Sequence, residues 1–312
     1  MENTNHPFPI ESPRPGIGAA AALMIIAFVG LWLSGVVVIA LVPEGSSWLD
    51  TVHTALYYAL FIALPIGIYV RRRPGMQDAM RLKPLPVLPT VSVILLALLS
   101  VYAVIALDAL WVRLLDGLGL RQPEAELTLE TSGALKWAVF TSAAIPGFCE
   151  ELLFRGVVFP AWERRGTLPA IAVSAALFML LHANLYGFPA YLLIGAISAF
   201  IVFALDSLYA GMIYHMVYNA AILLLAFQIA RIELPEGAAE AAGVSTLSIV
   251  SELAIMLALM AWMIVHLDHR RRVAGIEMRP HTRTPLRRSE WIPTLVAVVL
   301  MVIVTILVMA GV

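Results

Sequence analysis

The chain has 312 residues, of which 61% are hydrophobic and only 13% are charged. A soluble domain averages about 45–50% apolar and about 25% charged residues, so this composition excludes an ordinary soluble protein and predicts an integral membrane protein. The formal net charge of −1 gives no indication of nucleic-acid binding. A single cysteine, Cys149, excludes an intramolecular disulfide and a zinc site built from several cysteines.

Nine stretches of the chain are long and apolar enough to cross a bilayer, for which a helix needs about 20 apolar residues. In chain order they are approximately residues 17–42, 52–70, 86–112, 134–161, 168–186, 188–205, 208–230, 246–267 and 291–311. Open sheets cannot satisfy their backbone hydrogen bonds in lipid, so the predicted fold class is an all-α polytopic membrane protein with about nine transmembrane helices. The first stretch is too long for the apolar core of a signal peptide, and we expect it to be retained.

The order of these stretches divides the chain into three parts. Residues 1–133 hold an N-terminal tail and three spans, residues 134–230 hold a core of four spans, and residues 231–312 hold two spans joined by a basic loop. The loops at 113–133 and 231–245 have no core-forming content, so we expect them to be connections and not separate domains.

Basic residues gather in the loops on one side of this nine-span arrangement. These loops are 71–83, 162–167 and 268–290, whereas the loops on the other side are mainly acidic. Cytoplasmic loops of membrane proteins carry an excess of Lys and Arg. We therefore expect a multi-pass protein of the cell (plasma) membrane, embedded in the lipid bilayer with its N-terminus in the cytoplasm and its C-terminus outside.

Three short polar patterns interrupt the apolar stretches. They are Glu150-Glu151-Leu-Leu-Phe-Arg155 in the fourth stretch, Phe178-Met-Leu-Leu-His182 in the fifth and His215-Met-Val-Tyr-Asn219 in the seventh. Charge at bilayer depth is costly, so ionisable residues inside a span indicate a functional site by default. Counting about 1.5 Å per helical residue places the three patterns at similar depth, and we expect them to line one pocket.

The spacing within each pattern suggests how the side chains divide their roles. Residues four apart share a helix face, so Glu151 and Arg155 are expected to form an ion pair that is structural. Glu150 points about 100° away from Glu151 and faces a different neighbour. A carboxylate beside a histidine can activate water as a general base, while a second imidazole and an amide, here His215 and Asn219, can stabilise an oxyanion.

A metal site is the alternative for the same residues. Glu150, His182 and His215 are of the types that bind Zn²⁺, and three protein ligands with one open position suit hydrolysis. The sequence contains no His-Glu-x-x-His pattern, so a zincin-type site is not indicated. The residues leave both a metal-assisted and a metal-free mechanism open.

Taken together and in this order, the three patterns resemble the signature of the CAAX-protease and bacteriocin-processing (CPBP, or abortive-infection-like) family of intramembrane proteases. That family carries Glu-Glu-x-x-x-Arg, Phe-x-x-x-His and His-x-x-x-Asn. The resemblance covers about residues 134–230 and implies a four-helix catalytic core made of spans four to seven. It implies a CAAX prenyl protease-like endopeptidase, commonly called a metalloprotease, that cleaves a membrane-associated peptide or a prenylated protein.

The resemblance also implies a role for each matching position. Glu150 corresponds to the catalytic glutamate and His182 to its partner in water activation. His215 and Asn219 correspond to the groups that stabilise the oxyanion. The supporting positions are Glu151, Arg155 and Phe178.

Two other classes of function account for the same polar residues. In a non-catalytic membrane protein that binds a partner peptide, such as an immunity protein, these residues would only hold the bundle together. In a proton-coupled transporter, intramembrane Glu and His would form a proton relay. The sequence lacks the paired repeats and broken-helix pairs that are typical of transporters.

Overall fold

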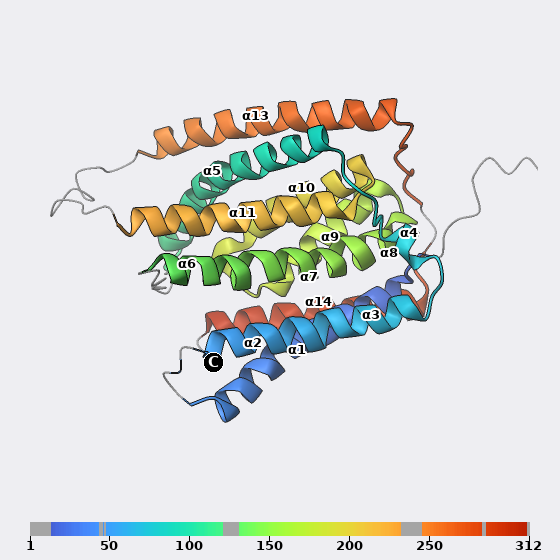
Figure 1. Ribbon diagram of the computed structural model, residues 1–312, viewed down its shortest axis with the longest axis horizontal. Coiled ribbons are helices and arrows are strands. Elements are labelled where there is room, and N and C mark those ends of the chain that lie inside the picture. Colours follow the sequence, from blue (N-terminus) through green and yellow to red (C-terminus); the bar gives the residue numbers. More distant parts are fainter. Residues whose placement is uncertain are drawn as a thin grey trace, which may run out of the picture.

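The structure is a computed structural model that describes residues 14–43, 46, 48–120, 131–231, 245–282 and 285–310 (Figure 1). All regular structure in these ranges is helical. The all-α fold class predicted from the composition is therefore confirmed, and within the described ranges seven helices are long and apolar enough to cross a membrane.

The first part of the chain consists of three long helical segments. Its elements are α1 (Ile17–Leu41), α2 (Leu49–Leu56), the π-helical η1 (Tyr57–Ala63), α3 (Leu64–Arg71), the short α4 (Met76–Ala79) and α5 (Val87–Gly117). α2, η1 and α3 follow one another without a break and together form the second span. The span ends at Arg71, where three consecutive arginines leave the apolar region.

The middle of the chain begins with a continuous helical run over residues 132–163. It consists of α6 (Ser132–Val139), η2 (Phe140–Ala144), α7 (Ile145–Leu153), η3 (Phe154–Val158) and α8 (Phe159–Glu163). The two π-helical turns, η2 and η3, are each followed by a proline at the second position of the next helix, Pro146 and Pro160. Proline has no N–H to donate to the preceding turn, so the helical ladder widens at these points.

Two antiparallel helices and a third long helix complete the core. They are α9 (Thr167–Leu181), α10 (Phe188–Leu205) and α11 (Leu208–Ile229), with a short 3₁₀ turn, η4 (Leu185–Gly187), between the first two. α9 has only fifteen residues, about 22 Å of helix, whereas the hydrocarbon core of a bilayer is about 30 Å thick. α9 is therefore shorter than a straight span, and the chain reverses direction through η4 shortly after His182.

The last two helices, α13 (Thr246–Val273) and α14 (Arg288–Met309), pack on opposite sides of this core. Figure 1 shows α13 beside α5 at one edge, and α14 with α1, α2 and α3 at the other. Residues 132–163 and α9 to α11 lie between these two groups. The outer helices thus enclose the part of the chain that carries the three polar patterns.

Seven of the nine predicted spans correspond to the seven helices that are long and apolar enough to cross a bilayer. The other two are α9, which is too short, and the run over residues 132–163, which carries charged residues in its middle. These two segments bear His182 and Glu150. The segments that deviate from the pattern of an ordinary span are thus the ones with the candidate site.

Candidate active site

Glu151 is held in a buried hydrogen-bond network. Its Oε1 accepts a hydrogen bond from Arg155 Nη1 at 2.8 Å and lies 3.1 Å from His215 Nδ1. Its Oε2 accepts a hydrogen bond from Ser198 Oγ at 2.7 Å. Glu151 and Arg155 are both 0% exposed. The expected ion pair is therefore present, and the three contacts of the Glu151 carboxylate offset part of the cost of burying its charge.

Arg155 links this network to the neighbouring helices. Its Nη2 donates a hydrogen bond to the carbonyl oxygen of Gly195 in α10, at 2.8 Å, and its guanidinium lies 4.8 Å from the centre of the Phe178 ring. The Phe178 ring also contacts the rings of His182 and His215, with centroids 4.7 and 5.6 Å apart. Phe178 is therefore the packing surface that fixes the two histidines relative to the ion pair.

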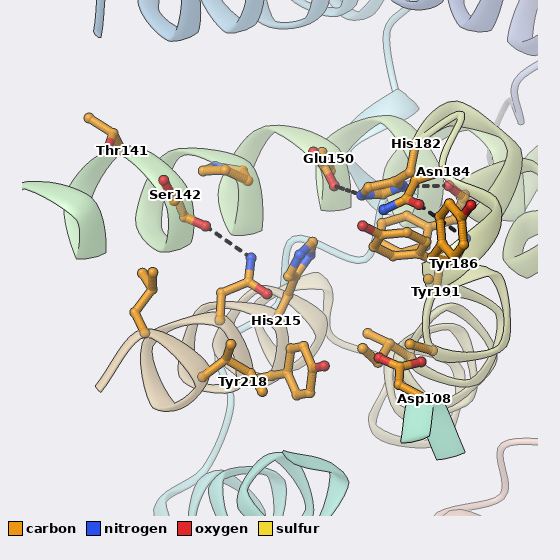
Figure 2. A pocket seen from close by; sticks show the side chains of 18 of the residues that line it. Asp108, Thr141, Ser142, Glu150, His182, Asn184, Tyr186, Tyr191, His215 and Tyr218 are labelled. Atoms are coloured by element: carbon orange, nitrogen blue, oxygen red, sulfur yellow. Dashed lines mark hydrogen bonds and ion pairs between the residues drawn. The ribbon is translucent and has the colours of Figure 1, made fainter. Parts of the chain in front are cut away.

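Glu150, one residue earlier, faces a cavity. Its Oε1 accepts a hydrogen bond from the hydroxyl of Tyr58 at 2.6 Å. Its Oε2 is buried, has no hydrogen-bond partner among the described residues and lies 3.9 Å from His182 Nε2 (Figure 2). The two adjacent glutamates thus differ as the 100° step of the helix predicts: one is fully paired and the other presents an oxygen to the cavity.

His182 is oriented by two contacts. Its Nδ1 lies 2.8 Å from the carbonyl oxygen of Phe178. Because a carbonyl oxygen only accepts, Nδ1 carries the proton in this contact, and Nε2 of the neutral ring is an acceptor. The ring also stacks on Tyr191, with centroids 3.9 Å apart and an interplanar angle of 19°. The lone pair of Nε2 therefore points to the side of the ring where Glu150 lies.

His215 and Asn219 project from α11 toward the same cavity. His215 Nδ1 contacts the Glu151 carboxylate, so this nitrogen carries the proton, while the rest of the ring lines the cavity. Asn219 Nδ2 donates a hydrogen bond to the carbonyl oxygen of Ser142 at 3.1 Å. Asn219 is thus tied to the widened turn η2, just before the helix that carries the glutamates.

One cavity of about 570 Å³ brings these groups together. Five of the predicted residues line it, namely Glu150, Phe178, His182, His215 and Asn219. The expected shared pocket is therefore present. Glu151 and Arg155 are not part of its lining and support it from behind.

Several residues of the site are not marked by any of the three patterns. Tyr58 comes from η1, which lies outside the three patterns, and Ser198 and Tyr191 come from the apolar helix α10. Asp108 of α5 also lines the cavity, and its Oδ1 is buried without a hydrogen-bond partner. Tyrosine and serine are common in membrane helices, so only the packing of the helices distinguishes the tyrosine and serine residues of the site from others in the chain.

Within the described ranges, no group of three or more His, Cys, Asp or Glu side chains is arranged to hold a metal ion. Glu150 and His182 are close, but His215 turns its Nδ1 to Glu151 and does not complete a three-ligand set with them. The zinc site predicted from these three residues stays a prediction, and the residues as arranged here do not fit it.

Comparison with known proteins agrees with the three patterns. Residues 132–221 match the family described as Type II CAAX prenyl endopeptidase Rce1-like. The search of curated proteins and the search of solved structures each gave no match. The matched range contains all three patterns but less than a third of the 312 residues, and α1 to α5, α13 and α14 lie outside it. Residues 132–221 of this multi-pass membrane protein therefore form a region similar to the CAAX-protease (CPBP) family.

Proposed function

We propose that the chain is an intramembrane endopeptidase in which Glu150 and His182 together activate a water molecule for attack on a peptide bond. The observation that supports this is the pair formed by Glu150 Oε2 and His182 Nε2, which lie 3.9 Å apart at the wall of the cavity. The carboxylate oxygen and the imidazole nitrogen are both hydrogen-bond acceptors in the protonation state that the Phe178 contact favours.

Two acceptors cannot hydrogen-bond to each other, but one water molecule can donate a hydrogen to each of them. Its oxygen lone pair is then directed away from both, toward a substrate in the cavity. Glu150 takes a proton from this water as it attacks the carbonyl carbon, and His182 holds the water in place. When the C–N bond breaks, the proton passes from Glu150 to the leaving nitrogen, which gives a carboxylic acid and an amine.

The negative charge that develops on the carbonyl oxygen needs hydrogen-bond donors. Asn219 uses one N–H of its amide for Ser142, which leaves the second for the oxyanion. His215 donates from Nε2 only when its ring is doubly protonated, since Nδ1 already donates to Glu151. In this proposal Asn219 is the principal donor to the oxyanion.

The proposed substrate is a membrane-associated or lipidated polypeptide, of which a prenylated protein ending in a CAAX-like sequence is the type suggested by the family. The cavity supports this choice because its lining mixes polar groups with apolar ones, such as Ile194, Ile222 and Leu223. A polypeptide with an apolar anchor reaches a membrane-embedded site by moving within the bilayer.

The test uses the purified full chain in lipid nanodiscs. Two peptides, one farnesylated and ending in a CAAX sequence and one identical but unmodified, are incubated with it, and the products are identified by mass spectrometry. Glu150→Gln is expected to lower the rate of cleavage about 10²–10⁴-fold, the range for loss of a general base. The matched control is Glu252→Gln, a change at an exposed glutamate of α13, which should cleave like the wild type.

Normal cleavage by a well-folded Glu150→Gln protein would refute the proposed role of Glu150. Cleavage of only the farnesylated peptide would support a prenylated substrate. Cleavage of both peptides would support endopeptidase activity and would show that the substrate does not need the lipid. If the wild type binds either peptide without cleaving it, the chain is a binding protein.

A further inference from the structure

The cavity reaches from the middle of the bundle toward one of its ends. In α11 its lining begins at His215, before the midpoint of the helix, and continues to Leu223, toward the C-terminal end. In the antiparallel run over residues 132–163 it extends from Thr141 to Glu150, in the middle of the run. Asp108 and Val112 of α5 lie toward the end of that helix at Gly117. Figure 1 shows that the C-terminal ends of α5 and α11 lie at the end of the bundle where α6 begins.

The other half of the bundle is filled by packed apolar side chains. Phe154, Val157 and Val158 adjoin Arg155 in the chain, and each is 0% exposed. Phe159 and Phe203 continue this layer and are at most 1% exposed. Protein interiors of this kind are close-packed, so the layer leaves no passage from the cavity to that end of the bundle.

A network of ion pairs lies at the same end of the bundle, beyond the apolar layer as seen from the cavity. Arg81 Nη2 donates hydrogen bonds to both carboxylate oxygens of Glu163, at 2.7 and 2.8 Å, and Arg81 Nε donates one to Asp206 at 3.0 Å. Lys83 also pairs with Asp206, and the backbone N–H of Leu208 donates to the carbonyl oxygen of Arg81 at 2.8 Å. These contacts join the α4–α5 connection, α8 and the turn between α10 and α11.

Charge identifies the side of the membrane on which each end lies. Among the described residues, the closed end carries most of the Lys and Arg side chains: Arg71, Arg72, Arg73, Arg81, Lys83, Arg164, Arg165, Arg270, Arg271, Arg272, Arg279, Arg287 and Arg288. The end with the cavity carries Arg113, Lys136 and Arg231 together with the acidic Asp50 and Asp116. An excess of Lys and Arg is typical of the cytoplasmic side.

We infer that the substrate reaches Glu150 from the outer, non-cytoplasmic side of the membrane. The substrate is then a membrane-associated polypeptide segment presented at that face, such as the outer part of a membrane protein or an exported peptide. This narrows the substrate class proposed above, because it excludes a prenylated C-terminus that lies in the cytoplasm. This inference rests on the proposed function, because only an enzyme has a substrate. The side on which the cavity is accessible rests only on the fold and the loop charges. Ser142 and Asn184, which line the cavity and are exposed, form its accessible rim.

The experiment is cysteine labelling in intact cells that express the full chain. The wild type serves as background, because its single cysteine, Cys149, is buried. Ser142→Cys is a nearly isosteric change at the rim of the cavity, and Gln77→Cys is its matched control at an exposed position of α4, among the basic loops. A membrane-impermeant maleimide is added before and after permeabilisation of the cells.

We expect Ser142→Cys to be fully labelled before permeabilisation and Gln77→Cys only after it. Labelling of Gln77→Cys in intact cells would reverse the orientation and overturn the inference. Labelling of Ser142→Cys only after permeabilisation would likewise overturn it, because the cavity would then be closed to the outer side. Neither outcome depends on catalysis, so the inference and the proposed function fail separately.

A second readout connects access to cleavage. For a substrate that the wild type cleaves in a Glu150-dependent manner, labelling of Ser142→Cys from outside is expected to abolish cleavage, and the same treatment should leave Gln77→Cys fully active. Unchanged cleavage by the labelled Ser142→Cys protein would show that the substrate takes a different route and would overturn the inference.

Discussion

The hydroxyl of Tyr58 donates a hydrogen bond to Glu150 Oε1 over 2.6 Å, although 92 residues separate the two side chains in the sequence. Tyr58 belongs to η1, outside the range that matches the CAAX-protease family, whereas Glu150 lies within that range. This bond leaves Glu150 Oε2 as the oxygen available for water. The N-terminal helices of this chain thus contribute directly to the geometry of the site.

Replacing Tyr58 by phenylalanine is expected to lower the rate of cleavage with little change in folding. A hydrogen bond to a charged group contributes about 1.5–3 kcal/mol, so kcat should fall about tenfold or more while KM changes little. The control is Tyr57→Phe, because the Tyr57 hydroxyl is buried without a hydrogen-bond partner in the described chain. Equal effects of the two changes would refute the positioning role of Tyr58.

The two adjacent glutamates are expected to respond differently to removal of their charge. Glu151→Gln leaves the fully buried Arg155 without its counter-charge, and breaking a buried ion pair costs about 3–5 kcal/mol. Glu150→Gln removes no hydrogen bond donated by a charged group. Thermal unfolding in detergent should show a lower Tm for Glu151→Gln, and a wild-type Tm for Glu150→Gln although its cleavage rate is lowered. A wild-type Tm for Glu151→Gln would contradict the structural role of the pair.

Gly211 is expected to be sensitive to the addition of a single methyl group. A Cβ at this position would lie 2.6 Å from Glu151 Oε2 and 3.0 Å from Ser198 Oγ, so Gly211→Ala should disrupt the buried network and lower both Tm and activity. Gly67→Ala is the matched control, because a Cβ there meets no atom within 4 Å. An alanine in a helix interior is favoured over glycine by about 1 kcal/mol, so the control should be neutral or stabilising. Tolerance of Gly211→Ala would contradict the close approach of α11 to the glutamates.

Asp108 is expected to reduce the stability of the wild-type chain. Its Oδ1 is buried at the cavity wall without a hydrogen-bond partner, and burying an unpaired polar group costs free energy. Asp108→Asn should therefore raise the Tm, while Asp116→Asn, at an exposed position of the same helix, should leave it unchanged. If activity falls as stability rises, Asp108 serves the site at a cost in stability. A lower Tm for Asp108→Asn would show that a partner for the carboxylate exists.

The polar patterns could be placed from the sequence because charge inside an apolar stretch is rare and helical spacing is regular. The ion pair of Glu151 with Arg155 and the separate direction of Glu150 both follow from the four-residue spacing and the 100° step. Their convergence with His182 followed from counting residues along antiparallel helices. These inferences depend on local geometry, which the sequence determines directly.

The remaining contacts depend on how helices that are distant in the sequence pack together. The periodicity of the sequence does not predict this packing. Ser198 is one of several small polar residues in apolar helices, and only the contact between α10 and α7 makes it a partner of Glu151. The shortness of α9 was also missed, because the apolar pattern continues through the turn after His182 into α10. An apolar residue in a membrane-embedded turn and one in a helix look the same in the sequence.

The π-helical turn η2 has a further consequence for the two glutamates that follow it. Such a turn holds one more residue than an α-helical turn. If the residues of η2 adopted α-helical geometry instead, everything after them would rotate by about 100° relative to α6. That angle equals the step between Glu150 and Glu151, so Glu150 would then point in the direction that Glu151 has now and would leave the cavity. The π-helical turn therefore sets the rotation of the helix, and with it which carboxylate is buried in the network and which one faces the cavity.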